Sequence, residues 1–125
     1  MTSLKNEFVL TIPGNPKYLS VVRLAVSGLA SRLQFSYEDV EDIKLAVAEA
    51  CAHAISHGQG QEITIECQVS DTALSFSIKD KGTEPLDEED LGLFLIRSLM
   101  DDVRIEMQNG SESRLRMKKA FSAVS

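Results

Sequence analysis

The chain has 125 residues and a formal net charge of −6, from 13 Lys and Arg residues against 19 Asp and Glu residues. With 43% hydrophobic and 26% charged residues, its composition is that of one globular domain, and a second domain would have little room. The acidic excess opposes binding to phosphate backbones and anionic membrane surfaces, so we expect neither nucleic-acid nor membrane partners. No apolar run approaches the roughly 20 residues that span a bilayer, and no secretion signal is evident, which favours a cytoplasmic protein.

The first thirty or so residues predict a strand and a helix. Apolar and polar residues alternate over residues 6–12, and a Pro-Gly pair follows, which is typical of a strand and its terminating turn. Asn15 followed by Pro16 is typical of a helix start. Apolar residues then recur at three- and four-residue steps, so we predict a helix over 16–33.

A second helix is predicted from the next start signal. Ser36 and Asp39 form a variant of the capping box, with Asp in place of the usual Glu or Gln. An apolar face continues from there to His57 and Gly58. Cys51 falls in this helix and Cys67 in a later strand, with no CxxC pair, so we expect two buried, reduced thiols.

The second half of the chain predicts two hairpins separated by a third helix. Period-two alternation marks the strands, a three- and four-residue repeat marks the helix, and Asn109-Gly110 marks a tight turn. The predicted elements are strands over 62–69 and 74–78, a helix over 91–100, and strands over 103–107 and 115–117. Residues 121–125 are expected to form a loose tail.

The order of these elements predicts an α+β fold. It lacks the strict strand-helix repetition of a doubly wound parallel sheet, so we infer a two-layer α/β sandwich. In the last strand, the alternating cations Arg114, Arg116 and Lys118 are interpreted as a solvated edge. Methionines 100, 107 and 117 are expected to fill the core.

One face of the second helix carries groups that could perform chemistry. Glu49, His53 and His57 are spaced i, i+4, i+8, so they form a line along the helix. An acid and two imidazoles in line can bind a metal or move protons, although the HExxH zinc motif lacks its glutamate here. Alternatively, a histidine at a helix C-terminus is simply stabilised by the helix dipole.

Two glycine-containing motifs are further candidates. Asp80-Lys81-Gly82 ends a predicted strand, where a carboxylate can lie at the floor of a pocket and glycine lets a ligand approach; a tight turn is the alternative. Gly92 begins the third helix, where exposed N–H groups favour a phosphate. Alternatively, Gly92 relieves a close contact between the helix and the sheet.

Taken together, the motifs resemble those of a known family. They follow one another as Glu49-Ala-Cys-Ala-His53-Ala-Ile-Ser-His57-Gly58, Asp80-x-Gly82, Leu91-Gly92-Leu93-Phe94-Leu95 and Met100-Asp101-Asp102-Val103. This order resembles the N-box and glycine boxes of bacterial anti-sigma-factor serine kinases, which belong to the GHKL ATPases and have the Bergerat fold. The resemblance covers about residues 8–119. It implies a single ATPase domain over 1–125, with a mixed, mostly antiparallel sheet covered on one face by three helices.

The resemblance also implies a function. Such kinases hold a sigma factor inactive, phosphorylate a serine on a STAS-type antagonist with ATP and Mg²⁺, and form homodimers. By position, Glu49 would be the general base and Asp80 the partner of the adenine amino group. Gly82 and Gly92 would lie around the nucleotide, and Arg23 would dock partner proteins.

Two departures from the family pattern keep other functions open. His53 stands where the family has a nucleotide-site asparagine that binds Mg²⁺, and Mg²⁺ prefers oxygen ligands. The long ATP lid of the family is reduced to residues 83–90, of which residues 84–90 carry five carboxylates; these are expected to cap the third helix and repel ATP. The alternatives are an active kinase, a pseudokinase that acts only by binding, and a transition-metal sensor using His53 and His57.

Overall fold

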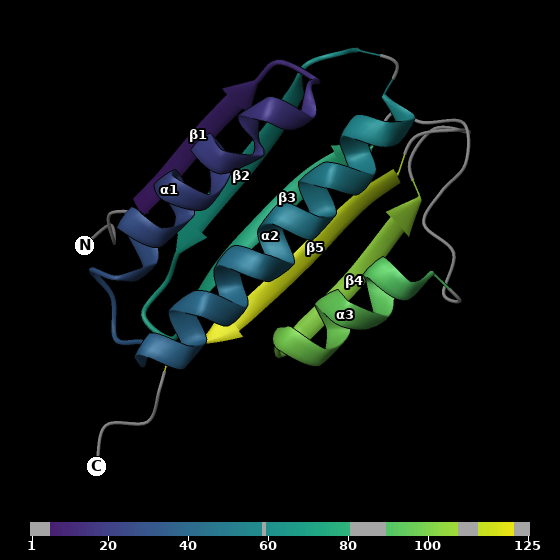
Figure 1. The fold of residues 1–125 in the computed structure, drawn as a ribbon. Coiled ribbons are helices and arrows are strands. Elements are labelled where there is room, and N and C mark those ends of the chain that lie inside the picture. Colours follow the sequence, from purple (N-terminus) through teal and green to yellow (C-terminus); the bar gives the residue numbers. More distant parts are fainter. Residues whose placement is uncertain (1–5, 59, 81–89, 108–112, 122–125) are drawn as a thin grey trace, which may run out of the picture.

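The computed structural model describes residues 6–58, 60–80, 90–107 and 113–121. Within these residues, three α-helices cover one face of a five-stranded sheet (Figure 1). In chain order the elements are β1 (Asn6–Ile12), the 3-10 turn η1 (Pro16–Tyr18), α1 (Leu19–Ala30), α2 (Tyr37–His57), β2 (Ile63–Val69), β3 (Ala73–Asp80), α3 (Leu91–Leu99), β4 (Asp102–Met107) and β5 (Ser113–Ala120). The predicted two-layer α+β class is confirmed.

The sheet has the strand order β1-β2-β3-β5-β4. All four pairings among the described strands are antiparallel, so the parallel component expected of a mixed sheet is not found there. Each strand places alternate side chains toward the helices, where Ile65, Phe76 and Met117 are almost fully buried. The core therefore lies between the sheet and the helical layer.

The first helix is shorter than predicted. Asn15 does cap the start, because its side chain accepts a 3.0 Å hydrogen bond from the backbone N–H of Lys17, but the first turn is η1. The α-helix ends at Ala30. Leu33 lies in the turn that follows the helix, but its side chain packs against the core. It therefore extends the apolar repeat of the sequence past the end of the helix.

The second helix begins and ends as predicted. The Ser36 side chain accepts a 3.1 Å hydrogen bond from the backbone N–H of Asp39 at the N-terminus. At the C-terminus, a Cβ on Gly58 would lie 2.9 Å from the Ala54 carbonyl oxygen, so only glycine fits there without a shift. Helix α2 lies between α1 and α3 over the middle of the sheet (Figure 1).

Two expectations about the C-terminal strands are wrong. Strand β5 lies between β3 and β4, so the row Arg114, Arg116 and Lys118 is not on an edge. Alternation along a strand shows which face a side chain takes, but not whether the strand has one neighbour or two. Met107 is 56% exposed, and it is the last residue of β4, which is an edge strand of the sheet.

Both cysteines are buried and free, as expected. Burial raises the pKa of each thiol to about 12, and for Cys51 the neighbouring Cys67 adds to the effect. Both groups therefore stay protonated near neutral pH. None of the helices described is both long enough and apolar enough to cross a lipid bilayer.

Candidate functional site

The predicted line of side chains on α2 faces the contact with α3. Glu49 and His53 are both partly buried there. The rings of His53 and His57 meet edge to face, with centroids 4.1 Å apart and planes at 89°. The i, i+4, i+8 spacing thus produces a continuous polar row along α2 beside the third helix.

The start of α3 is capped by its own carboxylate. Asp90 is the N-cap residue, and its Oδ1 atom accepts hydrogen bonds from the backbone N–H groups of Gly92 (2.7 Å) and Leu93 (3.3 Å). These are donors that a helix N-terminus would otherwise offer to a phosphate. The expectation that the acidic segment caps the third helix is confirmed for Asp90, while residues 84–89 lie outside the described part of the chain.

At Gly92 a side chain of α2 lies close against the backbone of α3. A Cβ on Gly92 would lie 2.8 Å from Glu49 Oε1 and 2.9 Å from Asp90 Oδ1. The close contact that Gly92 relieves is therefore with two carboxylates, not with the sheet. Glu49 and Asp90 both direct oxygen atoms at the first turn of α3, which makes this turn electrostatically negative.

The histidine of this group lies near the same cap. His53 Nε2 is 4.0 Å from Asp90 Oδ2, and the His53 side chain is only 14% exposed. A protonated His53 would offset part of the negative charge of Asp90. Glu49, His53, Asp90 and Gly92 thus form one group at the α2–α3 contact, which we name the carboxylate–histidine site.

The donor set of this site does not match a magnesium ion. Mg²⁺ requires near-octahedral oxygen ligands, whereas His53 offers an imidazole nitrogen and Asp90 Oδ1 already accepts two N–H bonds. Over the described ranges, no three side chains of His, Cys, Asp or Glu gather closely enough to hold a metal ion. The same finding gives no support to a transition-metal site at His53 and His57.

The other predicted nucleotide residues lie at the end of β3. Asp80 is the last residue of β3 and pairs with Ser113 of β5, and β3 packs beneath α2. The C-terminal ends of β3 and α2 lie at the same end of the molecule (Figure 1). Gly82 lies outside the described residues, so a pocket shared by Glu49, Asp80 and Gly82 stays a prediction.

Sequence reasoning missed Ser113 as a candidate. It is 2% exposed and directly opposite Asp80 in the register. Period-two alternation back from Leu115 would have placed this serine on the buried face. Ser113 therefore adds a buried hydroxyl to the strand that pairs with the end of β3.

Arg23 lies apart from this site. It is exposed on α1, and α2 lies between α1 and α3 (Figure 1). Two large apolar neighbours on the same helix are also exposed, Val21 at 43% and Leu24 at 74%. Arg23 therefore belongs to a separate surface of the helical layer.

Comparison with known proteins places the fold in a family. The histidine kinase-like ATPase domain matches residues 12–119. The chain is 37% identical to serine-protein kinase RsbW of Bacillus licheniformis, with 78% of this chain and 76% of that protein covered. It is also 37% identical to serine-protein kinase RsbW of Listeria monocytogenes serovar 1/2a, with 88% and 85% covered.

Two solved structures agree in fold. The RsbU and RsbW domains of a Mycobacterium tuberculosis protein superpose with a TM-score of 0.71 at 18% identity, covering 96% of this chain and 34% of that one. The Acinetobacter baumannii histidine kinase AdeS gives a TM-score of 0.58 at 14% identity, with 91% and 68% covered. The chain therefore belongs to the histidine kinase-like ATPases and, among them, to the anti-sigma-factor serine kinase family that includes the RsbW proteins.

Proposed function

We propose that this chain is a cytoplasmic anti-sigma regulatory factor of the serine-kinase type. It would bind a sigma factor and a STAS-domain antagonist, phosphorylate a serine of the antagonist with ATP, and act as a homodimer as its family does. The observation that carries this proposal is the 37% identity to a serine-protein kinase over 78% of the chain. The structural feature that its chemistry would use is Glu49, whose Oε1 atom lies beside the first turn of α3.

In this proposal, Glu49 accepts the proton of the acceptor serine. Its Oε1 atom lies beside the backbone of Gly92, at the helix start where the family resemblance puts the nucleotide. A carboxylate held there could orient a serine hydroxyl and take its proton. Asp80 would recognise adenine, and Gly82 and Gly92 would let the nucleotide approach the backbone.

The partner surface of this proposal lies on α1. Arg23, with exposed Val21 and Leu24 beside it, combines a cation with apolar area. Arginine within apolar surroundings is a frequent contributor to protein–protein binding energy. We therefore assign docking of the sigma factor or the STAS protein to this face.

A binding-only function is the second candidate, and two observations favour it. Asp90 already occupies the N–H groups of Gly92 and Leu93. The sequence also predicts a lid reduced to residues 83–90, and the alignment with the Listeria monocytogenes kinase, which runs over 134 residues, covers 88% of this chain. A shortened lid and a capped helix start would both weaken ATP binding.

Phosphoryl transfer distinguishes the two candidates. Purified protein is incubated with radiolabelled ATP, Mg²⁺ and each purified STAS-domain protein of the source organism. Under the kinase proposal the label appears on serine, Glu49→Gln lowers the rate by at least about 100-fold, and the matched Glu62→Gln leaves it unchanged. Absence of label together with retained binding of the STAS protein or sigma factor would establish the binding-only function.

Partner binding is tested separately on α1. Arg23→Ala should weaken the complex with the sigma factor or STAS protein by about tenfold, and Arg32→Ala, also an exposed arginine, should not. If wild type, Arg23→Ala and Arg32→Ala all bind the partner with equal affinity, Arg23 is not part of the interface. Failure of wild-type protein to bind any sigma factor or STAS protein of the organism would overturn the proposed function as a whole.

A further inference from the structure

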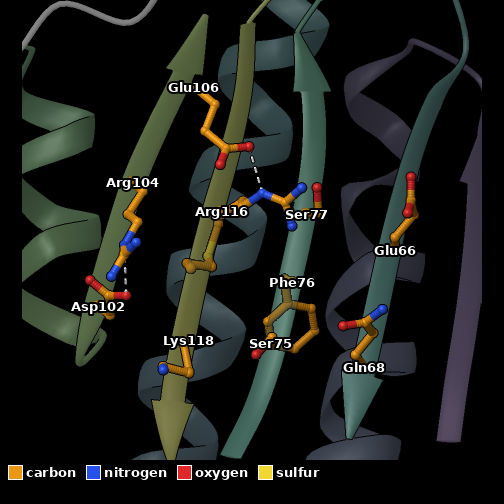
Figure 2. Close-up of a pocket in the computed structure, with 11 residues that line it drawn as sticks. Glu66, Gln68, Ser75, Phe76, Ser77, Asp102, Arg104, Glu106, Arg116 and Lys118 are labelled. Atoms are coloured by element: carbon orange, nitrogen blue, oxygen red, sulfur yellow. Dashed lines mark hydrogen bonds and ion pairs between the residues drawn. The ribbon is translucent and has the colours of Figure 1, made fainter. Parts of the chain in front are cut away.

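A hollow lies on the face of the sheet opposite the three helices, away from the carboxylate–histidine site. Figure 2 shows side chains of β2, β3, β5 and β4 standing on this open face. The hollow has a volume of about 400 Å³. Its charged and polar lining consists of Glu66, Gln68, Ser75, Ser77, Asp102, Arg104, Glu106, Arg116 and Lys118.

The strand register concentrates cations in this hollow. Arg104 of β4 lies directly opposite Arg116 of β5, a like-charge pair that is unfavourable unless anions lie close by. Arg104 Nε binds Asp102 Oδ2 at 3.1 Å, and Arg116 Nε binds Glu106 Oε1 at 2.6 Å. Both of these bonds use Nε, so the terminal guanidinium nitrogens of the two arginines take no part in them; those of Arg116 lie toward Ser77 of β3 (Figure 2).

The carboxylates of this face do not neutralise all its cations. Glu66 is engaged by Arg114, whose Nη1 lies 3.2 Å from Glu66 Oε1 and 2.7 Å from Ser77 Oγ. Lys118 lies between Ser75 and Asp102 in the register, yet no carboxylate of the described residues is within ion-pair distance of its ammonium group. The lining itself holds three cations and three carboxylates, and Arg114 and Glu7 adjoin it, in a chain whose net charge is −6.

We propose that this hollow binds a phosphate dianion carried by a small molecule. Guanidinium groups match phosphate oxygens with pairs of N–H donors, and a lysine ammonium adds a point charge. Lys118 and the free guanidinium nitrogens of Arg104 and Arg116 supply those donors, with the Ser75 hydroxyl beside them. A volume of about 400 Å³ suits a small phosphate ester.

The first test is an amide NMR titration of the whole chain. Sodium phosphate and glycerol 3-phosphate should shift the amides of Ser75, Ser77, Arg116 and Lys118 saturably, whereas sodium chloride at matched ionic strength should not. Equal shifts with chloride would overturn the proposal. The peptide Ala-phosphoserine-Ala is titrated separately. If this peptide binds at least tenfold more tightly than glycerol 3-phosphate, the ligand is a phosphorylated protein side chain, and the small-molecule assignment is overturned.

Two variants with opposite expected effects complete the test. Lys118→Gln should weaken phosphate binding by about fivefold, because it removes the cation that has no carboxylate partner. Glu106→Gln should tighten binding by a similar factor, because it removes a negative charge and releases Arg116 Nε. Arg32→Gln, a matched loss of an exposed cation elsewhere, should change nothing. If Lys118→Gln binds as wild type does, or Glu106→Gln binds no tighter, the assignment of these residues fails.

Discussion

The Oδ1 atom of Asp90 accepts a 2.7 Å hydrogen bond from the backbone N–H of Gly92, at the first turn of α3. An anion arriving from solvent would compete with this internal carboxylate for the same donor. The cap therefore stabilises the helix and lowers its affinity for phosphate at the same time. Stability and nucleotide affinity should respond in opposite directions when Asp90 is changed.

Replacing Asp90 with Ala tests this opposition. The free energy of unfolding should fall by about 1 kcal/mol, since an N-cap is lost. ATP affinity, measured by isothermal titration, should rise by severalfold because two N–H groups are released and a negative charge is removed. Asp71→Ala, an exposed acidic residue in the β2–β3 turn, is the matched control and should change neither quantity. A loss of ATP affinity in Asp90→Ala would contradict the competition between cap and phosphate.

Replacing Gly92 with Ala tests the contact between α2 and α3. The new Cβ would lie 2.8 Å from Glu49 Oε1 and 2.9 Å from Asp90 Oδ1, so both carboxylates must move and the cap bond is strained. We expect a loss of about 1 kcal/mol in urea unfolding experiments. In a Glu49→Ala background, part of that loss should disappear, because one of the two clashing groups is absent.

The matched control for this substitution is Gly28→Ala in α1. A Cβ on Gly28 would meet no heavy atom within 4 Å. That variant should therefore gain about 0.8 kcal/mol from helix propensity alone. Equal stability changes at both glycines would show that the approach of Glu49 and Asp90 to Gly92 has no energetic consequence.

The elements were largely predictable because local signals specify them. Ser36 caps α2 as the capping-box pattern indicated, and the alternation over 6–12 marks β1. Long-range pairing was not predictable in the same way. Nothing local in Arg116 indicates that β5 has β3 on one side and β4 on the other, so its row of cations was read as an edge.

The site was predictable only in part, for the same reason. The spacing of Glu49, His53 and His57 fixes their common face on α2 regardless of tertiary structure. The approach of Glu49 and Asp90 to Gly92 depends on how closely α2 and α3 pack. No local sequence signal specifies that packing distance. Motif order identified the family, because several weak signals in a fixed order constrain a fold more than any one of them.

Replacing Lys119 with Met should destabilise the fold through the end of α3. Lys119 Nζ donates a 2.7 Å hydrogen bond to the Leu99 carbonyl oxygen and lies within 4 Å of carboxylate oxygens of Asp39 and Asp42 on α2. Its side chain is only 12% exposed, so methionine would keep the apolar stem, while the Leu99 carbonyl oxygen would lose this donor and the two carboxylates would lose a nearby positive charge. We expect a loss of about 2 kcal/mol in urea unfolding. Lys118→Met, on the open face, should change stability by less than about 0.5 kcal/mol.

The buried thiols predict a pH dependence of stability above pH 9. The pKa of Cys51 is raised to about 12 in the folded chain, against an ordinary value of 9.0. Below pH 9 both states hold the proton, so the thiol does not affect the equilibrium. As pH rises from 9 toward 12, the unfolded chain releases the proton first and is favoured, by up to about 1.4 kcal/mol per pH unit for each such thiol.

Urea unfolding at pH 8, 9 and 10 measures this effect. The variant with both Cys51 and Cys67 replaced by Ala should be less stable at pH 8, because buried volume is lost. It should nevertheless lose less stability than wild type between pH 9 and pH 10. Lysines and tyrosines also titrate in this range, but they are the same in both proteins, so their effect cancels in the comparison. Parallel pH profiles of the two proteins would show that the thiols ionise in the folded chain as readily as in the unfolded one, against their burial in the core between α2 and the sheet.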